Sequence, residues 1–335
     1  MEVKTVAKKS TKIALTYVIT IVVTVVIILV VGLIAIKKTN RSGSISDIEV
    51  TSSTEPEVYT PGVLDNQTTL FVLDAEDRMS ATAFVLTRLL PAEKRLVIVP
   101  LQSDMYAVVN GVEGTIYDFY RSDGIQGAKR AVENVCGLTA EKYMIFDKSS
   151  FETMAAHFET VNHIFSDTLI YENEKTGEIT VIREGNCSLD PTTMRKAFTY
   201  PDYRNGETER AALIGEIVTD FVNASGERLR TSMDQVFSGI LNSGAETDIT
   251  VYDYDFKKEA LQYMADNSSE CAELVLPSGV YDAEGRYVLD ASFVDSLRSW
   301  FSLDIYGDDS FSEDDSMPID SASELPAAYS APTLE

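Results

Sequence analysis

The longest apolar stretch of the chain runs from Ile13 to Ile36, with Lys12 before it and Lys37–Lys38 after it. As a helix rising about 1.5 Å per residue, it would reach about 36 Å, which exceeds a bilayer's hydrocarbon core of about 30 Å. Its β-branched residues would suit a strand in water, but a lone strand in lipid leaves its backbone groups unbonded. The pattern therefore predicts a transmembrane helix; the alternative is a buried core helix of a soluble protein.

Further along, short β-rich runs alternate with segments of helical periodicity. Strands are expected at Thr69–Asp74, Thr82–Thr87, Leu96–Pro100, Tyr143–Phe146 and Ile179–Arg183. Helices are expected from Gly124–Gln126 to Gly137, from Pro191 through Phe198, and at Ser150–His157, Glu209–Val222, Leu229–Leu241, Phe256–Ala265 and Phe293–Trp300. The helix at Ser150–His157 is expected to have Ser149 or Ser150 as its cap. A hairpin-like stretch is expected over Ala272–Leu289. This mixture predicts an α/β fold: a layered mixed sheet flanked by helices, preceded by one transmembrane helix.

Composition divides the chain into five segments. We expect a cytoplasmic tail (1–12), the transmembrane helix (13–36), an extracellular stalk rich in Ser, Thr, Glu and Pro (37–66), a globular domain (67–301) and a disordered acidic tail (302–335). A very short basic tail before the helix and a large acidic domain after it place the N-terminus in the cytoplasm and the domain outside. No small-residue cleavage site follows the helix, so the anchor is expected to be retained.

Charge and reactive side chains narrow the classes of partner and site. With 28 Lys and Arg against 53 Asp and Glu, the formal charge is −25, which argues against nucleic acid or an anionic membrane surface as a direct partner. The three cysteines, Cys136, Cys187 and Cys271, include no C-x-x-C pair, so no zinc site or disulfide framework is expected, although one bridge remains possible. His157 and His163 fit no zinc motif, which favours structural or solvent-facing roles.

The order of segments resembles the extracellular domain of the LytR-CpsA-Psr family, also called cell-envelope-related transcriptional attenuators. That family has a strand ending in Asp before Arg-Ser-Asp-Thr, a strand ending Ile-Pro-Arg-Asp, and a Leu-Asp-Gly helix motif followed by a long helix. The matching stretches here are LFVLDAEDRMSATAFVLT, VIVPLQSDMY, GTIYDFYRSDGIQGAKRAVENVCGL, LDPTTMRKAFTYPD and ERAALIGEIVTDFV. The resemblance covers residues 67–301 and rests on pattern and order rather than on intact motifs.

The resemblance implies a specific chemistry, and the departures from it bear on that chemistry. Active members transfer glycopolymers from a polyprenyl pyrophosphate to peptidoglycan, using a carboxylate-held divalent metal and an arginine clamp. At the family's motif positions this chain has Met79, Ala81, Leu101, Gln102, Tyr117, Asp202, Glu207 and Ala211. Asp74 and Arg210 remain in register, and Arg78 and Arg204 lie near it. We therefore expect no catalytic residues and no metal site, and these four side chains are the ligand-binding candidates.

The leading hypothesis is a membrane-anchored, catalytically degenerate LytR-CpsA-Psr-like envelope protein that binds a ligand or a partner. One alternative is an active glycopolymer transferase with a displaced site, for which Asp77 and Asp104 would be available and Mg²⁺ would be needed. Another is an adaptor or sensor whose acidic tail contacts basic envelope proteins. No cofactor is expected otherwise. The expected partners are the membrane, a polyprenyl lipid or cell-wall glycan, and basic envelope proteins, with no nucleic acid.

The family fold also implies an apolar tunnel for the polyprenyl chain. The side chains that could line it here are Phe84, Leu86, Met144, Phe146, Met154 and Phe158. The same residues could equally fill an ordinary core, which is the more frequent arrangement in proteins. Sequence alone does not separate the two.

Overall fold

The computed structural model describes residues 59–75, 80–172, 177 and 179–303. The expected cytoplasmic tail, transmembrane helix and most of the stalk and acidic tail lie outside these residues, and so does Arg78. Among the described residues, no helix is both long enough and apolar enough to span a bilayer. The domain described below extends slightly past its expected end, because Ser302 is buried and Leu303 packs against the core.

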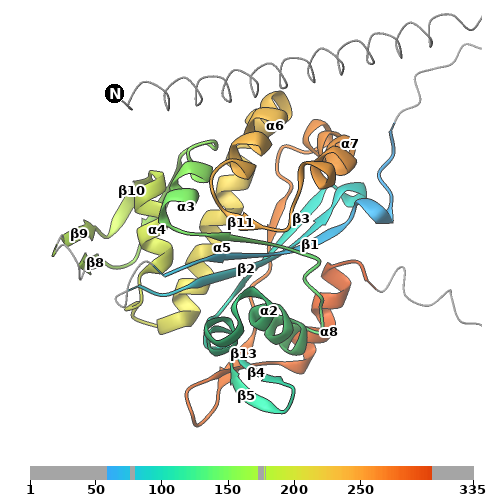
Figure 1. Ribbon diagram of the computed structural model, residues 1–335. Coiled ribbons are helices and arrows are strands. Elements are labelled where there is room, and N and C mark those ends of the chain that lie inside the picture. Colours follow the sequence, from blue (N-terminus) through green and yellow to red (C-terminus); the bar gives the residue numbers. More distant parts are fainter. Residues whose placement is uncertain (1–58, 76–79, 173–176, 178, 304–335) are drawn as a thin grey trace, which may run out of the picture. The chain divides into compact units, whose positions relative to one another are not determined.

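A six-stranded mixed sheet forms the centre of the domain (Figure 1). Its strands, in spatial order, are β11 (Glu246–Thr247), β6 (Lys142–Phe146), β1 (Gln67–Leu73), β2 (Ala83–Leu90), β3 (Arg95–Leu101) and β12 (Ala272–Leu274). The central strand β1 runs antiparallel to β2 and parallel to β6, and β3 runs antiparallel to β2 and parallel to β12. The expected α/β fold with a layered mixed sheet is confirmed.

Helices cover both faces of this sheet (Figure 1). Because side chains alternate along a strand, one face presents Leu70, Val72, Phe84 and Leu86 to helices α2 (Ile116–Cys136) and α8 (Ala291–Trp300). The opposite face, which includes Leu73, Val85 and Ile98, is covered by α3 (Lys148–Ala155), α4 (Pro191–Thr199) and α5 (Gly206–Ala224). We call the first the filled face and the second the cavity face, because side chains of the second line an apolar cavity.

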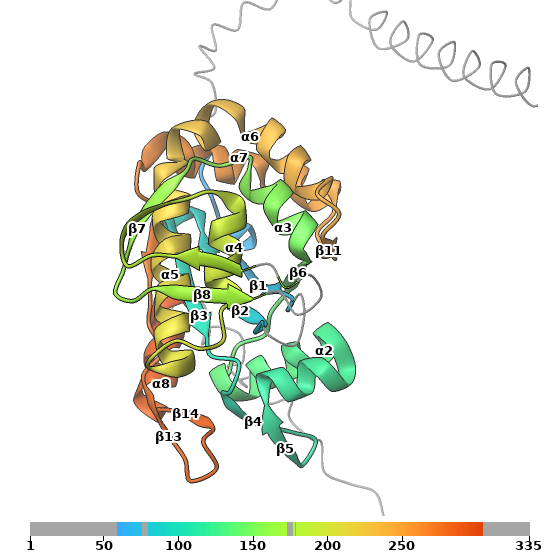
Figure 2. The same cartoon turned by 90° about the vertical axis from the view of Figure 1, so that its left-hand side faces the viewer.

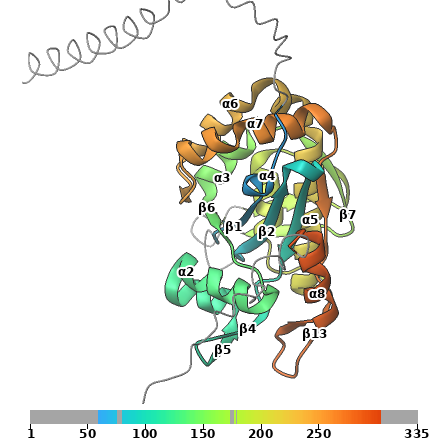
Figure 3. The ribbon, with the colours of Figure 1, turned by 90° about the vertical axis from the view of Figure 1, so that its right-hand side faces the viewer.

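The remaining elements lie mainly at the two ends of the sheet. Helices α6 (Gly226–Leu241) and α7 (Val251–Asn267) lie at one end, and the hairpins β4–β5 (Tyr106–Val109, Val112–Thr115) and β13–β14 (Gly279–Tyr281, Tyr287–Leu289) lie at the other (Figures 2 and 3). The fold also has two further antiparallel strand pairs, β7–β10 (Val161–Phe165, Gly185–Leu189) and β8–β9 (Leu169–Glu172, Ile179–Ile182). It has two short 3₁₀ helices, η1 (Val63–Asp65) and η2 (Pro91–Glu93).

Helix α2 differs from the expectation that it starts after Gly124. It begins at Ile116, where Thr115 and Asp118 form a reciprocal capping box. The helix is interrupted at Asp123 and Gly124, and Gly124 has a left-handed backbone with φ of 55°. Gly127 permits the two halves to approach, because a Cβ there would lie 2.0 Å from the carbonyl oxygen of Phe119.

Three other local expectations are corrected or resolved by the structure. The cap of α3 is Asp147, not Ser149 or Ser150, because the Asp147 carboxylate accepts a hydrogen bond from the Ser150 amide at 2.8 Å. The expected hairpin over Ala272–Leu289 is only half correct: β12 joins the main sheet and only β13 and β14 pair with each other. All three cysteines are free, so the possible disulfide does not form.

Candidate functional site

Asp74 lies immediately after β1, at the end of the sheet from which the family's first carboxylate would act. Its amide donates to the carbonyl of Phe146 at 2.8 Å, which fixes the backbone there. Its carboxylate accepts hydrogen bonds from Tyr120 on α2, from Thr82 and from the Ala75 amide. Partial burial raises the pKa of Asp74 and outweighs these three bonds, which act to lower it. The structure thus turns Asp74 toward α2, where burial and the Asp74 charge in turn raise the pKa of Tyr120.

The two positions where the family would have further acidic groups carry no charge. Ala81 has only a methyl group, and its amide donates to the carbonyl of Thr199 at 2.8 Å. Gln102 is 2% exposed, and its Oε1 accepts from the Tyr281 hydroxyl at 3.0 Å and from Thr208 at 3.3 Å. Within the part of the chain that the structure describes, no group of three or more His, Cys, Asp or Glu is arranged to hold a metal ion.

Arg210, on α5, is the retained member of the family's arginine pair, and it lies inside the protein at 2% exposure. Its Nε donates to Glu207 at 2.9 Å, its Nη1 to the carbonyl of Phe198 at 3.0 Å and its Nη2 to the carbonyl of Thr82 at 3.0 Å. Its Nη2 also pairs with the second carboxylate oxygen of Glu207. Four of the five guanidinium hydrogens are therefore directed at protein oxygens.

Glu207 completes this cluster from the position where the family has arginine. Besides Arg210, it accepts hydrogen bonds from the Ser103 hydroxyl at 2.8 Å and from the Ser103 amide at 3.1 Å. Burial acts to raise the pKa of Glu207, but the Arg210 charge and these donors hold it below its usual range. Glu207 is therefore ionised at neutral pH and neutralises Arg210 internally.

Asp104 lies beside the pair formed by Glu207 and Arg210. Burial, and then the negative charge of Glu207, raise the pKa of Asp104 to about 6. Its Oδ1 is buried and has no hydrogen-bond partner among the described residues. We refer to Gln102, Ser103, Asp104, Glu207, Arg210 and Tyr281 as the polar cluster. It joins the end of β3, the start of α5 and the hairpin β13–β14.

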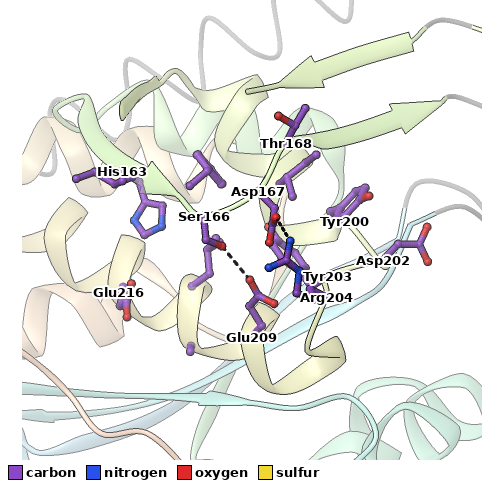
Figure 4. Close-up of a pocket in the computed structure, with 15 residues that line it drawn as sticks. His163, Ser166, Asp167, Thr168, Tyr200, Asp202, Tyr203, Arg204, Glu209 and Glu216 are labelled. Atoms are coloured by element: carbon purple, nitrogen blue, oxygen red, sulfur yellow. Dashed lines mark hydrogen bonds and ion pairs between the residues drawn. The ribbon is translucent and has the colours of Figure 1, made fainter. Parts of the chain in front are cut away.

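Arg204 lies apart from Arg210. It is exposed and forms an ion pair with Asp167 at 2.5 Å, at the side of a pocket of about 390 Å³ between the β7–β8 turn and α5 (Figure 4). Figure 4 shows that this pocket also holds Glu209, bonded to Ser166, and Glu216. Asp202, which occupies a family arginine position, lines the same pocket. The structure therefore does not bring Arg204 and Arg210 together around one ligand.

An apolar cavity of about 340 Å³ lies on the cavity face of the sheet, beneath α3 to α7. Four of the six side chains proposed for such a tunnel line it: Met144, Phe146, Met154 and Phe158. The other two, Phe84 and Leu86, point to the filled face and belong to the core against α2 and α8. Strand alternation explains this division, because Val85 lies between them and does line the cavity.

The polar cluster adjoins one end of this cavity. Arg210 donates to the carbonyl of Phe198, whose side chain lines the cavity, and to the carbonyl of Thr82, which precedes the cavity residue Ala83. Tyr120, Ser103 and Tyr281 had no role in the sequence interpretation. Tyr281 is 179 positions from Gln102, so no local pattern could have connected them. The Glu207–Arg210 pair did have a local signal, since its spacing of three suits contact on a helix.

Comparison with known proteins places the fold. No family model matches the chain, and no curated protein is significantly similar to it. Among solved structures, a protein from Eubacterium siraeum described as a transcription regulator aligns with a TM-score of 0.63 at 21% identity, covering 78% of this chain and 99% of that one. TagV of Bacillus subtilis aligns with a TM-score of 0.54 at 15% identity, covering 71% and 96%.

TagT, in a structure bound to LI-WTA, aligns with a TM-score of 0.52 at 14% identity, covering 72% of this chain and 90% of that one. TagV and TagT are both LytR-CpsA-Psr family members. These identities are too low to carry an activity across, but the alignments span almost the whole of each neighbour. The resemblance found in the sequence is thus confirmed at the level of structure, and the chain has the LytR-CpsA-Psr fold.

Proposed function

We propose that this chain is a membrane-anchored envelope protein that holds the apolar chain of a lipid in its central cavity and does not transfer phosphoryl groups. The observation that carries the proposal is the state of Arg210. The one arginine retained in register with the family's clamp is buried, and its donors are directed at Glu207, Phe198 and Thr82. A pyrophosphate would have to displace these bonds in order to bind.

The cavity supports lipid binding through its size and its lining. Its volume of about 340 Å³ lies within the range of about 300–1,000 Å³ that is usual for ligand sites. Its walls are built from Phe, Leu, Ile, Val and Met side chains of the sheet and of the helices above it. At about 24 cal/mol per Å³, filling such a volume with hydrocarbon recovers contacts on the order of 8 kcal/mol. That is comparable with the stability of a whole domain, about 5–15 kcal/mol.

The charges of the polar cluster support the absence of transfer. Phosphoryl transfer depends on cations that neutralise the phosphate oxygens. Here Ala81 and Gln102 remove two acidic groups that would hold a metal, and Glu207 puts a negative charge where the family has a positive one. The cluster has one arginine and two carboxylates, so it repels an anion rather than clamping it. The structure of TagT bound to LI-WTA supports a ligand that carries a glycopolymer as the class for this fold.

A cavity-filling substitution tests the lipid half of the proposal. Full-length protein is purified from bacterial membranes, and the lipid that co-purifies is extracted and measured by mass spectrometry. Val218→Trp fills the cavity from α5 and is expected to lower the lipid content at least tenfold. Thr153→Trp, on an exposed position of α3, is the matched control and should leave it unchanged. If Val218→Trp leaves the lipid content as unchanged as the control does, the proposal is wrong.

A phosphate-release assay tests the other half. Full-length protein is incubated with a polyprenyl pyrophosphate and with Mg²⁺ or Mn²⁺, and no release above background is expected. Metal-dependent release that Asp74→Ala abolishes would show instead that a displaced transferase site is active. The membrane topology has its own test. Cys187 should react with an impermeant thiol reagent in intact cells, since residues 37–335 are proposed to lie outside the cytoplasm.

A further inference from the structure

The cavity has a second end, far from the polar cluster. Gly226, Ala265 and Ser268 line both the cavity and a surface pocket of about 1000 Å³. This pocket, which we call the mouth, lies between the start of α6 and the end of α7, the end of the domain opposite the β13–β14 hairpin (Figure 3). Just inside it, Leu229 and Met264 begin the apolar lining. The mouth therefore connects the apolar interior with solvent.

The two ends differ in what they offer a polar head group. At the polar cluster, the donors of Arg210 already bond Glu207, Phe198 and Thr82, and Gln102 is bonded to Tyr281. The mouth is a solvent-accessible pocket of about 1000 Å³ with backbone and side-chain polar groups around it. A bound amphiphile therefore loses less hydration if its head lies in the mouth.

The charge of the mouth restricts the chemistry of that head group. Four carboxylates line it: Asp220, Glu227, Asp266 and Glu270. Its one basic residue, Arg230, pairs with Glu227 through Nη2 at 2.6 Å and Nε at 3.0 Å. The positive end of α6 and the negative ends of α5 and α7 all line the opening, so the helix termini do not cancel the charge of the carboxylates. The net field of the mouth is negative and opposes a phosphate.

We propose that the head group of the bound lipid lies in the mouth and is uncharged or cationic, with the apolar chain pointing toward the polar cluster. This inference rests on the proposed function, because it assumes that the cavity holds an apolar chain. It reverses the direction that the family's arginine clamp would impose. The ligand class is a single-chain amphiphile with a hydroxyl-rich or amine head, such as a glycosylated prenol.

Three probes with one farnesyl chain test the head-group preference. Farnesyl glucoside, farnesylamine and farnesyl phosphate are titrated into full-length protein in nanodiscs of zwitterionic lipid, and the bound fraction is measured. We expect the glucoside and the amine to bind at least tenfold more tightly than the phosphate. Ala265→Trp, which narrows the mouth, should lower the affinity for the glucoside and for the amine at least tenfold. Asp255→Trp, on the exposed side of α7, should not lower either affinity.

A charge reversal provides a test that does not depend on blocking the mouth. Asp220→Lys and Glu270→Lys change exposed side chains, so the fold should survive, and thermal unfolding verifies that. Each should raise the affinity for farnesyl phosphate severalfold and lower that for farnesylamine. Asp255→Lys, which changes the net charge equally but lies away from the mouth, is the control and should change neither by more than about twofold.

The outcomes separate this inference from the proposed function. If Val218→Trp abolishes binding of all three probes but Ala265→Trp and the charge reversals change nothing, the cavity binds lipid and the mouth proposal is wrong. If farnesyl phosphate binds most tightly and Arg210→Met removes that preference, the head lies at the polar cluster and the mouth proposal is also wrong. If no probe binds, the proposed function itself fails.

Discussion

The two faces of the central sheet are made from the same strands but are packed differently. On the filled face, Phe84, Leu86 and Val99 are fully buried against α2 and α8. On the cavity face, Leu73 and Val85 are almost as buried, yet they border a volume of about 340 Å³. Burial alone thus does not distinguish a side chain in a filled core from one that lines a cavity. The distinction lies in what each side chain contacts.

The largest expected effect is at the polar cluster that ends the cavity face. Arg210→Met leaves the largely buried Glu207 without its counter-charge, and breaking a buried pair costs about 3–5 kcal/mol. Arg204→Met, an exposed arginine paired with Asp167, should cost no more than about 1 kcal/mol. The free energy of unfolding, from denaturant titration, measures both. Adding Glu207→Leu to Arg210→Met should recover most of the loss, and no recovery would show that the carboxylate is not the cause.

The next effect compares one residue type on the two faces. Leu86→Ala should fall near the top of the range of about 2–5 kcal/mol for buried leucines, because its neighbours on the filled face cannot collapse into the space. Leu73→Ala should fall near the bottom, because its methyl groups border an existing cavity. Denaturant unfolding of both variants gives the difference. Equal losses would mean that the cavity face is packed as tightly as the other.

A smaller effect concerns pH and Asp104. Because burial and Glu207 raise its folded-state pKa to about 6, the folded protein binds more protons than the unfolded chain between pH 4 and 6. Stability should therefore fall as the pH rises through that window and stay level above it. After allowance for solvent screening, the change is about 1 kcal/mol. Asp104→Asn should remove this dependence and raise stability at pH 7. An unchanged pH profile would exclude Asp104 as its source.

The smallest expected effect is on stability after truncation. Deleting residues 304–335 should leave the thermal midpoint of the full-length protein nearly unchanged, since acids without bases and few large apolar groups do not form a core. The same deletion should weaken capture of a basic protein such as lysozyme, and so should added salt. Calorimetry and a pull-down at two salt concentrations measure these. If neither the deletion nor the added salt changes the capture of the basic protein, the adaptor role loses its support.

Much of the fold could be predicted from local patterns. The strands β1, β2 and β3 appear within two or three residues of their expected bounds, because each is a short apolar run between polar residues. The strand pairing that was predicted wrongly depends on contacts between residues distant in sequence. The pairing of Ala272–Leu274 with β3 is parallel and long-range, so no turn signal announces it. The capping of α3 by Asp147 was missed because Ser149 and Ser150, two and three positions later, are equally good caps.

The candidate site was predictable only in part. Register with the family identified Asp74 and Arg210, but not that Arg210 is buried with its donors directed at protein oxygens. Whether Met144 and Phe146 fill a core or line a cavity could not be decided from composition, because both arrangements use the same side chains. Their distinction depends on how far α3, α5 and α7 stand from the sheet, which is a property of the whole packing.

The Glu207–Arg210 pair also constrains how this chain can change by mutation. A two-arginine clamp would require Glu207 to become basic, and this one step would place two like charges side by side in a largely buried site. The intermediate would lose several kcal/mol, a large part of a domain's total stability. Changing Arg210 first leaves a buried carboxylate, with a similar loss. Both single-step paths would therefore lower the stability of the domain, so the internal ion pair opposes the gain of a second arginine at position 207.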